Sequence, residues 1–244
     1  MKRWFMFWKI FLYPMAKLLF PFKIMNKEKY KKYARGQITI SNHLSWMDVP
    51  YVYYGTKGFK RLLSKTENGG GEFRRAAFRS IGIIFVNRER PELSSMRECL
   101  NALKDGQTLA IFPEGTRNKV NRDLQPLHSG AAMFALKGNA AVVPLVIHHK
   151  ARLFKRNYIA VGDPVKLDDL FGKRLDENVL NEATERFSAA MQKTLDELDK
   201  WVENKGYKRS GKRADKKAAA ELDKLYKFAE KAAKKEYAES SSRR

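Results

Sequence analysis

Between Gly36 and Val165, short apolar runs rich in branched residues alternate with segments of helical periodicity. Six runs read as strands because they are short, apolar and bounded by Gly, Pro or Asn: Ile38–Ile40, Leu62–Leu63, Ile83–Val86, Leu109–Phe112, Val142–Ile147 and Tyr158–Val161. Apolar residues at helical spacing predict helices over Glu92–Lys104, Gly130–Lys137 and residues 176–204. Strands that alternate with helices predict an α/β fold, with a mostly parallel sheet flanked by helices. Ligands of such folds bind at the carboxyl ends of the strands.

Two polar motifs follow predicted strands, where such a ligand would bind. The first, Asn42-His43-Leu44-Ser45-Trp46-Met47-Asp48, comes directly after the first run. An imidazole can take a proton from an attacking hydroxyl if a carboxylate holds its other nitrogen and stabilises the cation. His43 and Asp48 meet only if the chain turns into a helix between them. The alternative is that His43 serves a turn and Asp48 caps a helix.

The second motif, Phe112-Pro113-Glu114-Gly115-Thr116-Arg117, ends the run that begins at Leu109. Gly115 lets the backbone approach a ligand, and Thr116 and Arg117 supply hydrogen-bond donors for a phosphate. Arg88 follows Ile83–Val86 and offers a planar donor fork of the same kind. The alternatives are a plain surface turn and a surface arginine.

Together these blocks resemble the NHxxxxD, GxxFxxR and FPEGTR motifs of the 1-acyl-sn-glycerol-3-phosphate (lysophosphatidate) acyltransferases. The resemblance covers residues 36 to about 165 and implies acyl transfer from a thioester to lysophosphatidic acid, which gives phosphatidic acid in phospholipid biosynthesis. Val142–Ile147 is similar to the family's closing strand and is expected to line the acyl pocket. The sequence departs from the family at His128, where many members carry Lys, and at Gly69-Gly70-Gly71, which predict an unusually flexible loop.

The resemblance also implies roles for single residues. His43 would be the base and Asp48 its orienting acid. Arg88, Gly115, Thr116 and Arg117 would hold the acceptor's phosphate, and Glu114 would contact its glycerol. The acyl donor would be an acyl-carrier-protein or coenzyme A thioester, and neither a cofactor nor a metal is expected.

The chain's 49 Lys and Arg against 27 acidic residues give a formal net charge of +22, which favours a polyanionic partner. Residues 4–25 are rich in Trp, Phe, Leu, Ile and Met but are interrupted by Lys9, Lys17 and Lys23, so we expect an interfacial membrane anchor. A single span and a cleaved signal peptide are the alternatives. The aromatic excess lies in this segment, which favours an anionic membrane surface at the cytoplasmic face over nucleic acid. The lone Cys99 suits a reducing compartment.

The predicted domains are a membrane anchor with a basic segment at 1–35, an acyltransferase domain at 36–205 and a basic helical or partly disordered tail at 206–244. Other functions stay open: an acyltransferase for glycerol-3-phosphate or another lysolipid, or a non-enzymatic basic protein that binds membranes or nucleic acid.

Overall fold

The structure is a computed structural model that describes residues 14–15, 17–30, 36–55, 59–87 and 92–204 of the 244-residue chain. Contacts divide the chain into two units, Met1–Asp199 and Lys200–Arg244. Of the second unit, only residues 200–204 are described, as the end of a helix. The predicted basic tail at 206–244, most of the predicted anchor and Arg88 therefore lie outside the described residues.

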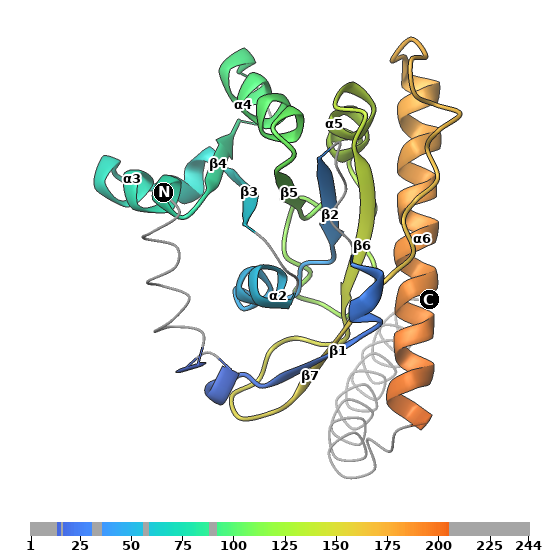
Figure 1. Ribbon diagram of the computed structural model, residues 1–244. Helices are drawn as coiled ribbons and strands as arrows, with labels where there is room; N and C mark the ends of the chain where they lie inside the picture. The colour runs from blue at the N-terminus through green and yellow to red at the C-terminus, as the bar shows by residue number, and fades with distance from the viewer. Residues whose placement is uncertain (1–13, 16, 31–35, 56–58, 88–91, 205–244) are drawn as a thin grey trace, which may run out of the picture. The chain divides into compact units, whose positions relative to one another are not determined.

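The first unit is built on one seven-stranded sheet, in the order β1-β7-β6-β2-β5-β3-β4 (Figure 1). The strands are β1 (Phe22–Met25), β2 (Gln37–Ser41), β3 (Lys60–Lys65), β4 (Ile83–Val86), β5 (Thr108–Ile111), β6 (Ala141–Ile147) and β7 (Asn157–Val161). In the order β6-β2-β5-β3-β4, all neighbouring strands are parallel. β7 runs antiparallel to β6, and β1 is parallel to β7. The predicted mostly parallel sheet is confirmed.

Helices cover both faces of this sheet. They are α2 (Asp48–Gly55), α3 (Glu72–Ser80), α4 (Leu93–Lys104), α5 (Gly130–Lys137) and α6 (Glu177–Asn204), with short 3-10 turns at Lys27–Lys29 and Thr66–Gly69. One apolar cluster joins the sheet to α4, α5 and α6, and a second joins its other face to α2 and α3. Successive strand residues point to opposite faces, so Ile111 enters the first cluster and Ala110 the second.

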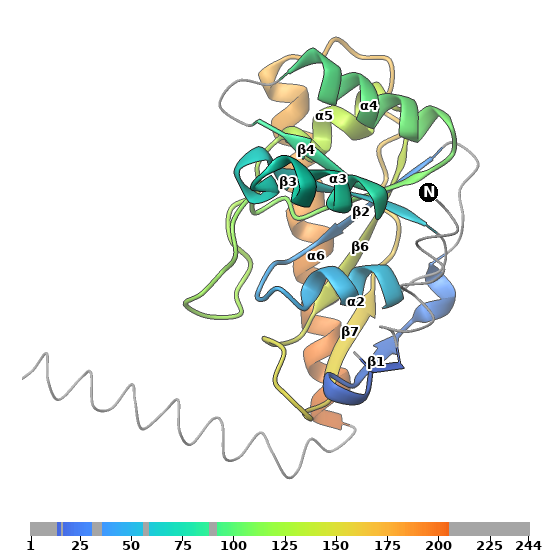
Figure 2. The same ribbon diagram turned by 90° about the vertical axis from the view of Figure 1, so that its left-hand side faces the viewer.

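The register brings the two sequence motifs together. β2 is the central strand of the seven-stranded sheet, with Ile40 opposite Ile111 of β5 and Pro144 of β6. The chain segments that leave β2 and β5 therefore emerge side by side at the carboxyl edge. Figure 2 shows the loop before α2 and the loop after β5 on the same side of the sheet.

The N-terminal prediction needs a correction at residues 22–25. This part of the predicted anchor forms β1, which pairs with β7, and the Phe22 ring packs edge-on against Tyr51 with centroids 5.3 Å apart. The segment's apolar residues thus cover the protein's own core. Within the described part of the chain, no helix combines the length and the apolar character that a membrane crossing requires. Residues 4–13 are not described, so their contact with membrane stays a prediction.

Two helices were not predicted, for physical reasons that the structure makes plain. α2 contains Pro50 and several branched or aromatic residues, but Pro is tolerated in a first helical turn because no helical N–H is lost there. α3 follows the three glycines that predicted a flexible loop, and it buries none of its side chains completely. Its amphipathic pattern is too short for periodicity alone to distinguish it from a loop.

Candidate active site

His43 and Asp48 meet at the turn between β2 and α2. His43 Nδ1 lies 2.9 Å from Asp48 Oδ2, and Asp48 is completely buried while the imidazole is partly exposed. A carboxylate accepts, so Nδ1 carries the proton and Nε2 is left with a free lone pair. The predicted juxtaposition of the two side chains is confirmed, and it depends on α2 starting at Asp48.

Asp48 is held by more than the imidazole. Its Oδ2 also accepts the backbone N–H groups of Leu44 at 2.5 Å and Ser45 at 2.6 Å, and its Oδ1 accepts the Ser45 hydroxyl at 3.0 Å. The carboxylate therefore closes the turn as well as holding the ring. Asp48 is thus the helix-start aspartate of the structural alternative, and it also holds the imidazole; its catalytic role stays a prediction.

The ring of His43 lies flat on Phe112, the first residue of the second motif, with centroids 4.1 Å apart and planes at 18°. Glu114, two residues after Phe112, is also buried. Burial raises the pKa of Glu114 to about 8, and the nearby Asp48 carboxylate also raises it. Neither of its carboxyl oxygens has a hydrogen-bond partner among the described residues. At neutral pH this side chain is therefore mostly protonated and can donate a hydrogen bond.

The phosphate-type donors of the second motif lie in a loop that is fastened to the catalytic turn. Gly115 adopts a φ of 76°, which favours glycine, and the loop then exposes Thr116. The Arg117 guanidinium stacks over the indole of Trp46, 4.2 Å from the ring centroid. The backbone N–H of Asn118 donates to the His43 carbonyl at 2.7 Å, so the loop cannot move independently of the base.

The far part of this loop is tied down as well. The Asn118 amide donates to Asn121 and to the Asp123 carbonyl, at 2.8 Å each. Arg122 makes two parallel hydrogen bonds to Asp199 of α6, at 3.0 and 2.8 Å. A fork of this kind fixes direction as well as distance. The loop between β5 and α5 is thus held at the sheet and at α6.

Arg88, the other predicted phosphate ligand, lies outside the described residues. The preceding residues are described: β4 ends at Val86, and Asn87 follows it at the carboxyl edge of the sheet. The strand that precedes Arg88 in the chain is therefore the predicted one. The contact of Arg88 with a phosphate stays a prediction.

An apolar cavity of about 530 Å³ opens beside Phe112. It is lined by the ends of β3, β4 and β5 and by residues of α4 and α5, among them Leu63, Val86, Met96, Ile111, Met133 and Phe134. His128, the residue that departs from the family pattern, lies on its wall. The expectation that Val142–Ile147 lines an acyl pocket is wrong for this cavity, because β6 lies inside the sheet and residues 142–147 are buried in the core.

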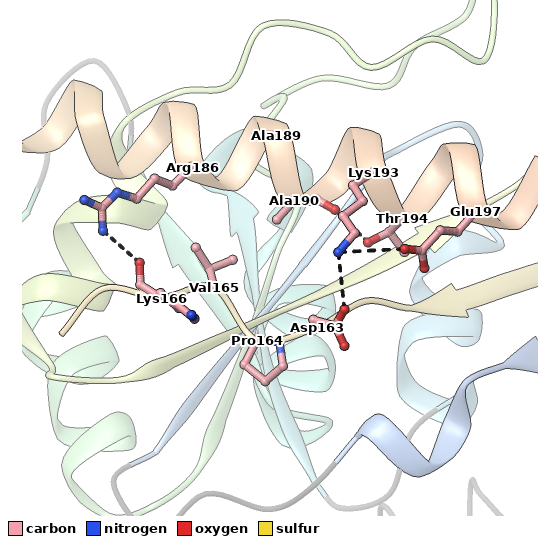
Figure 3. Close-up of a pocket in the computed structure, with 10 residues that line it drawn as sticks. All are labelled: Asp163, Pro164, Val165, Lys166, Arg186, Ala189, Ala190, Lys193, Thr194 and Glu197. Atoms are coloured by element: carbon pink, nitrogen blue, oxygen red, sulfur yellow. Dashed lines mark hydrogen bonds and ion pairs between the residues drawn. The ribbon is translucent and has the colours of Figure 1, made fainter. Parts of the chain in front are cut away.

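A second cavity, of about 690 Å³, lies between α6 and the segment after β7 (Figure 3). Because β7 runs antiparallel to β6, Val165 pairs with Val142 at the amino end of β6, on the opposite edge of the sheet from His43. Lys193 bridges Asp163 and Glu197 there, and Arg186 donates to the Lys166 carbonyl. In the part of the chain that the structure describes, no three His, Cys, Asp or Glu side chains come together in a way that would hold a metal ion.

The prediction from sequence assigned no role to Trp46, Asn118 or the cavity residues of α4 and α5. Trp46 stands inside the first motif and is 65% exposed, which is unusual for so large an apolar side chain. Its position in the sequence between His43 and Asp48 is a signal from which a role at the site could have been predicted. The bond from Asn118 to His43 is a backbone contact, for which the side chain gives no hint.

Comparisons with known proteins agree with this geometry. The sequence profile of a family described as Acyltransferase matches residues 21–148. A 1-acyl-sn-glycerol-3-phosphate acyltransferase of Helicobacter pylori is 29% identical over 133 residues, which are 53% of this chain and 56% of that protein. The enzyme of that name from Bacillus subtilis is 28% identical over 189 residues, 75% of this chain and 88% of its own.

Among solved structures, the 1-acyl-sn-glycerophosphate acyltransferase of Thermotoga maritima superposes with a TM-score of 0.52. It is 23% identical, and the match covers 70% of this chain and 71% of that one. At this identity the likeness concerns the fold. The match with the Helicobacter pylori relative spans little more than half of that protein's length.

Proposed function

The chain belongs to the Acyltransferase family, and we propose that it transfers an acyl group from an acyl thioester to the free hydroxyl of lysophosphatidic acid, giving phosphatidic acid for phospholipid biosynthesis. The observation that carries this proposal is the buried Asp48 carboxylate 2.9 Å from His43 Nδ1, beside a loop that presents an arginine. The names of the Helicobacter and Bacillus relatives support the acceptor.

In this mechanism the free Nε2 of His43 takes the proton from the acceptor's hydroxyl as its oxygen attacks the thioester carbonyl carbon. A carbon–oxygen bond forms, the carbon–sulfur bond breaks, and the imidazolium returns the proton to the departing thiolate. Asp48 holds the ring's orientation and stabilises its cation. The thioester is already activated, so no acyl-enzyme is needed.

The acceptor's phosphate is held by the loop that follows β5. Arg117 lies over the ring of Trp46, and its guanidinium N–H groups are the donors that we assign to the phosphate oxygens. Thr116 adds its hydroxyl donor, and Arg88 is the further arginine that we assign to this role. The Gly115 N–H, also expected to bind the phosphate, donates instead to the Phe112 carbonyl at 3.1 Å. Glu114, largely protonated at neutral pH, donates a hydrogen bond toward the glycerol part of the acceptor.

The apolar cavity beside Phe112 takes the acyl chain of the donor. Its surface is mostly apolar, and Phe112, the ring on which His43 is stacked, lines it. Bound there, an acyl chain has its thioester at the base. The donor is a thioester of acyl-carrier protein or coenzyme A, and the enzyme works at the cytoplasmic face of a membrane, whose lipids supply the acceptor.

The test is an acyl-transfer assay of the purified full chain with radiolabelled acyl-carrier-protein and coenzyme A donors. The acceptors should include lysophosphatidic acid, glycerol-3-phosphate and lysolipids without a terminal phosphate. We expect labelled phosphatidic acid as the main product. Transfer to glycerol-3-phosphate alone would change the acceptor, and no transfer to any phosphorylated acceptor would refute the proposal.

A further inference from the structure

The connection between β6 and β7 carries two adjacent exposed apolar residues at its turn. Leu153 is 53% exposed and Phe154 is 67% exposed. Neither packs into either apolar core cluster. Single exposed apolar residues are ordinary on a protein surface, but an adjacent Leu-Phe pair at the turn of a connection needs a reason.

The backbone of Phe154 adds to the case. Its φ is 55°, in the left-handed region that a bulky residue rarely adopts and that glycine adopts without strain. The conformation is fixed because the Phe154 N–H donates to the Leu19 carbonyl at 2.6 Å. An exposed Phe here therefore destabilises the fold and gains no internal packing in return, which points to a use outside the fold.

The surroundings of the pair are cationic. Lys150, Arg152, Lys155 and Arg156 flank it and are all exposed, and the sequence from 148 to 157 contains no acidic residue. Among the described residues, none of these four cations forms an ion pair with a carboxylate. Leu18, next to Leu19 in the chain, adds a further apolar side chain that is 72% exposed. Apolar side chains ringed by unpaired cations complement an anionic lipid surface.

This connection leaves the sheet at the same edge as the catalytic turn. Asn42, the residue before His43, donates from its side-chain amide to the Ile147 carbonyl at 2.9 Å and accepts the Ile147 N–H at 2.8 Å. The last residue of β6 is thereby fastened to the end of β2. In Figure 2 the connection between β6 and β7 lies on the same side of the sheet as the loop after β5.

We propose that the Leu153–Phe154 turn is a membrane-insertion element: its two apolar side chains enter the headgroup region of an anionic bilayer, and Lys150, Arg152, Lys155 and Arg156 bind the lipid phosphates around them. This contact adjoins the apolar segment near the N-terminus, which contributes Leu18 and is bonded to Phe154 through the Leu19 carbonyl. It sets the carboxyl edge of the sheet, with His43, against the membrane. Local insertion is measured without turnover, so its failure and the failure of the proposed acyl transfer are distinguishable.

The chain offers a direct probe, because Cys99 is its only cysteine and is buried. A Leu153→Cys variant therefore carries one accessible thiol, which takes an environment-sensitive fluorophore. Addition of vesicles of phosphatidylglycerol and phosphatidylcholine should shift the emission to the blue, and brominated lipid should quench it. The matched control is Ser188→Cys on α6, where the residue is exposed; its neighbour Arg186 contacts Lys166 at the opposite, amino edge of the sheet. There we expect neither effect.

Four outcomes overturn the proposal. The label at residue 153 could give no shift with vesicles, or the same shift as the label at residue 188. The emission of the residue-153 label could also be blue-shifted in dilute protein before vesicles are added. That result would mean that another part of the chain covers the turn. A shift that grows with protein concentration alone would assign the turn to contact between copies.

Charge and strain give two further readouts. Replacement of all four flanking cations by Gln should weaken vesicle binding about fivefold per charge at low salt, and the loss should shrink as salt rises. Phe154→Gly should raise Tm, because glycine accepts the positive φ, and should reduce the residue-153 label's shift. A Phe154→Gly variant with a lower Tm and undiminished insertion would show that the ring serves the fold.

Discussion

Two cavities of the described unit differ in what their polar groups do. In the cavity between α6 and the segment after β7, charged groups neutralise one another at the surface: Lys193 lies near two carboxylates, and Arg186 is paired with Asp169 and Glu182. Beside Phe112 the cavity is smaller, yet its neighbours are a buried carboxylate, an imidazole with a free nitrogen and a buried protonatable Glu114. Cavity size therefore does not identify the candidate site in this fold. Position at the carboxyl ends of the parallel strands identifies it.

The largest expected effect comes from removing the base. His43→Ala should lower kcat by about 10²- to 10⁴-fold, with the fold intact, because it removes general-base catalysis and little else. Asp48→Asn should also be slow, because it loses the charge that stabilises the imidazolium. Steady-state kinetics with circular dichroism as the control for folding is the measurement. A near-normal rate in His43→Ala would show that His43 is not the general base.

Next comes the phosphate loop. Arg117→Ala should raise the KM for lysophosphatidic acid about 10- to 100-fold and leave the donor's KM nearly unchanged, since it removes charge-assisted hydrogen bonds to the acceptor. Arg117→Lys should restore only part of this, because an ammonium lacks the planar fork. Trp46→Leu should raise the same KM about two- to fivefold, the size of an exposed cation–π contact. Equal effects on donor and acceptor would make the loop structural.

Filling the apolar cavity should change donor selectivity. Met133→Trp narrows the cavity beside Phe112, so kcat/KM for long-chain donors should fall about tenfold relative to short-chain donors. The assay is a competition between two labelled donors of different chain length. An unchanged ratio would show that the acyl chain lies elsewhere.

A pH effect on stability follows from Glu114. Burial raises its pKa from 4.5 to about 8, so between these values the folded chain holds a proton that the unfolded chain has released. The free energy of unfolding therefore falls as pH rises through this window, by at most about 1.4 kcal/mol per pH unit. Glu114→Gln cannot titrate, so its Tm should fall less between pH 5 and 8. Parallel Tm curves for the two proteins would contradict the raised pKa.

The smallest effect is expected in the other cavity. Lys193→Met removes two long, exposed ion-pair contacts, of 3.7 and 3.9 Å, and should change the free energy of unfolding by about 0–1 kcal/mol. Acyl transfer should be unchanged. A loss of activity comparable with that of Met133→Trp would mean that both cavities serve the reaction.

Much of the core could be predicted from the sequence, because its strands and long helices carry their patterns locally. Among the described elements, six of the seven strands and three of the five helices α2 to α6 lie within a few residues of the predicted ranges. β1 was missed because an aromatic, lysine-interrupted segment has the same composition whether it meets lipid or a neighbouring strand. Only the pairing of Phe22–Met25 with Asn157–Ala160 distinguishes the two.

The sequence carries the residue types of the predicted site at this edge of the sheet: an imidazole, a carboxylate and a phosphate-type loop, in two motifs that each follow an apolar strand. Tertiary structure decided which groups meet. The central place of β2 brings the turn at His43 beside Phe112, and the same packing buries Glu114 and raises its pKa. The strained exposure of Phe154 depends in the same way on a bond to Leu19, 135 residues earlier in the chain. Residue types are written in the sequence, but pairing between distant segments and the loss of water around a side chain exist only once the chain has folded.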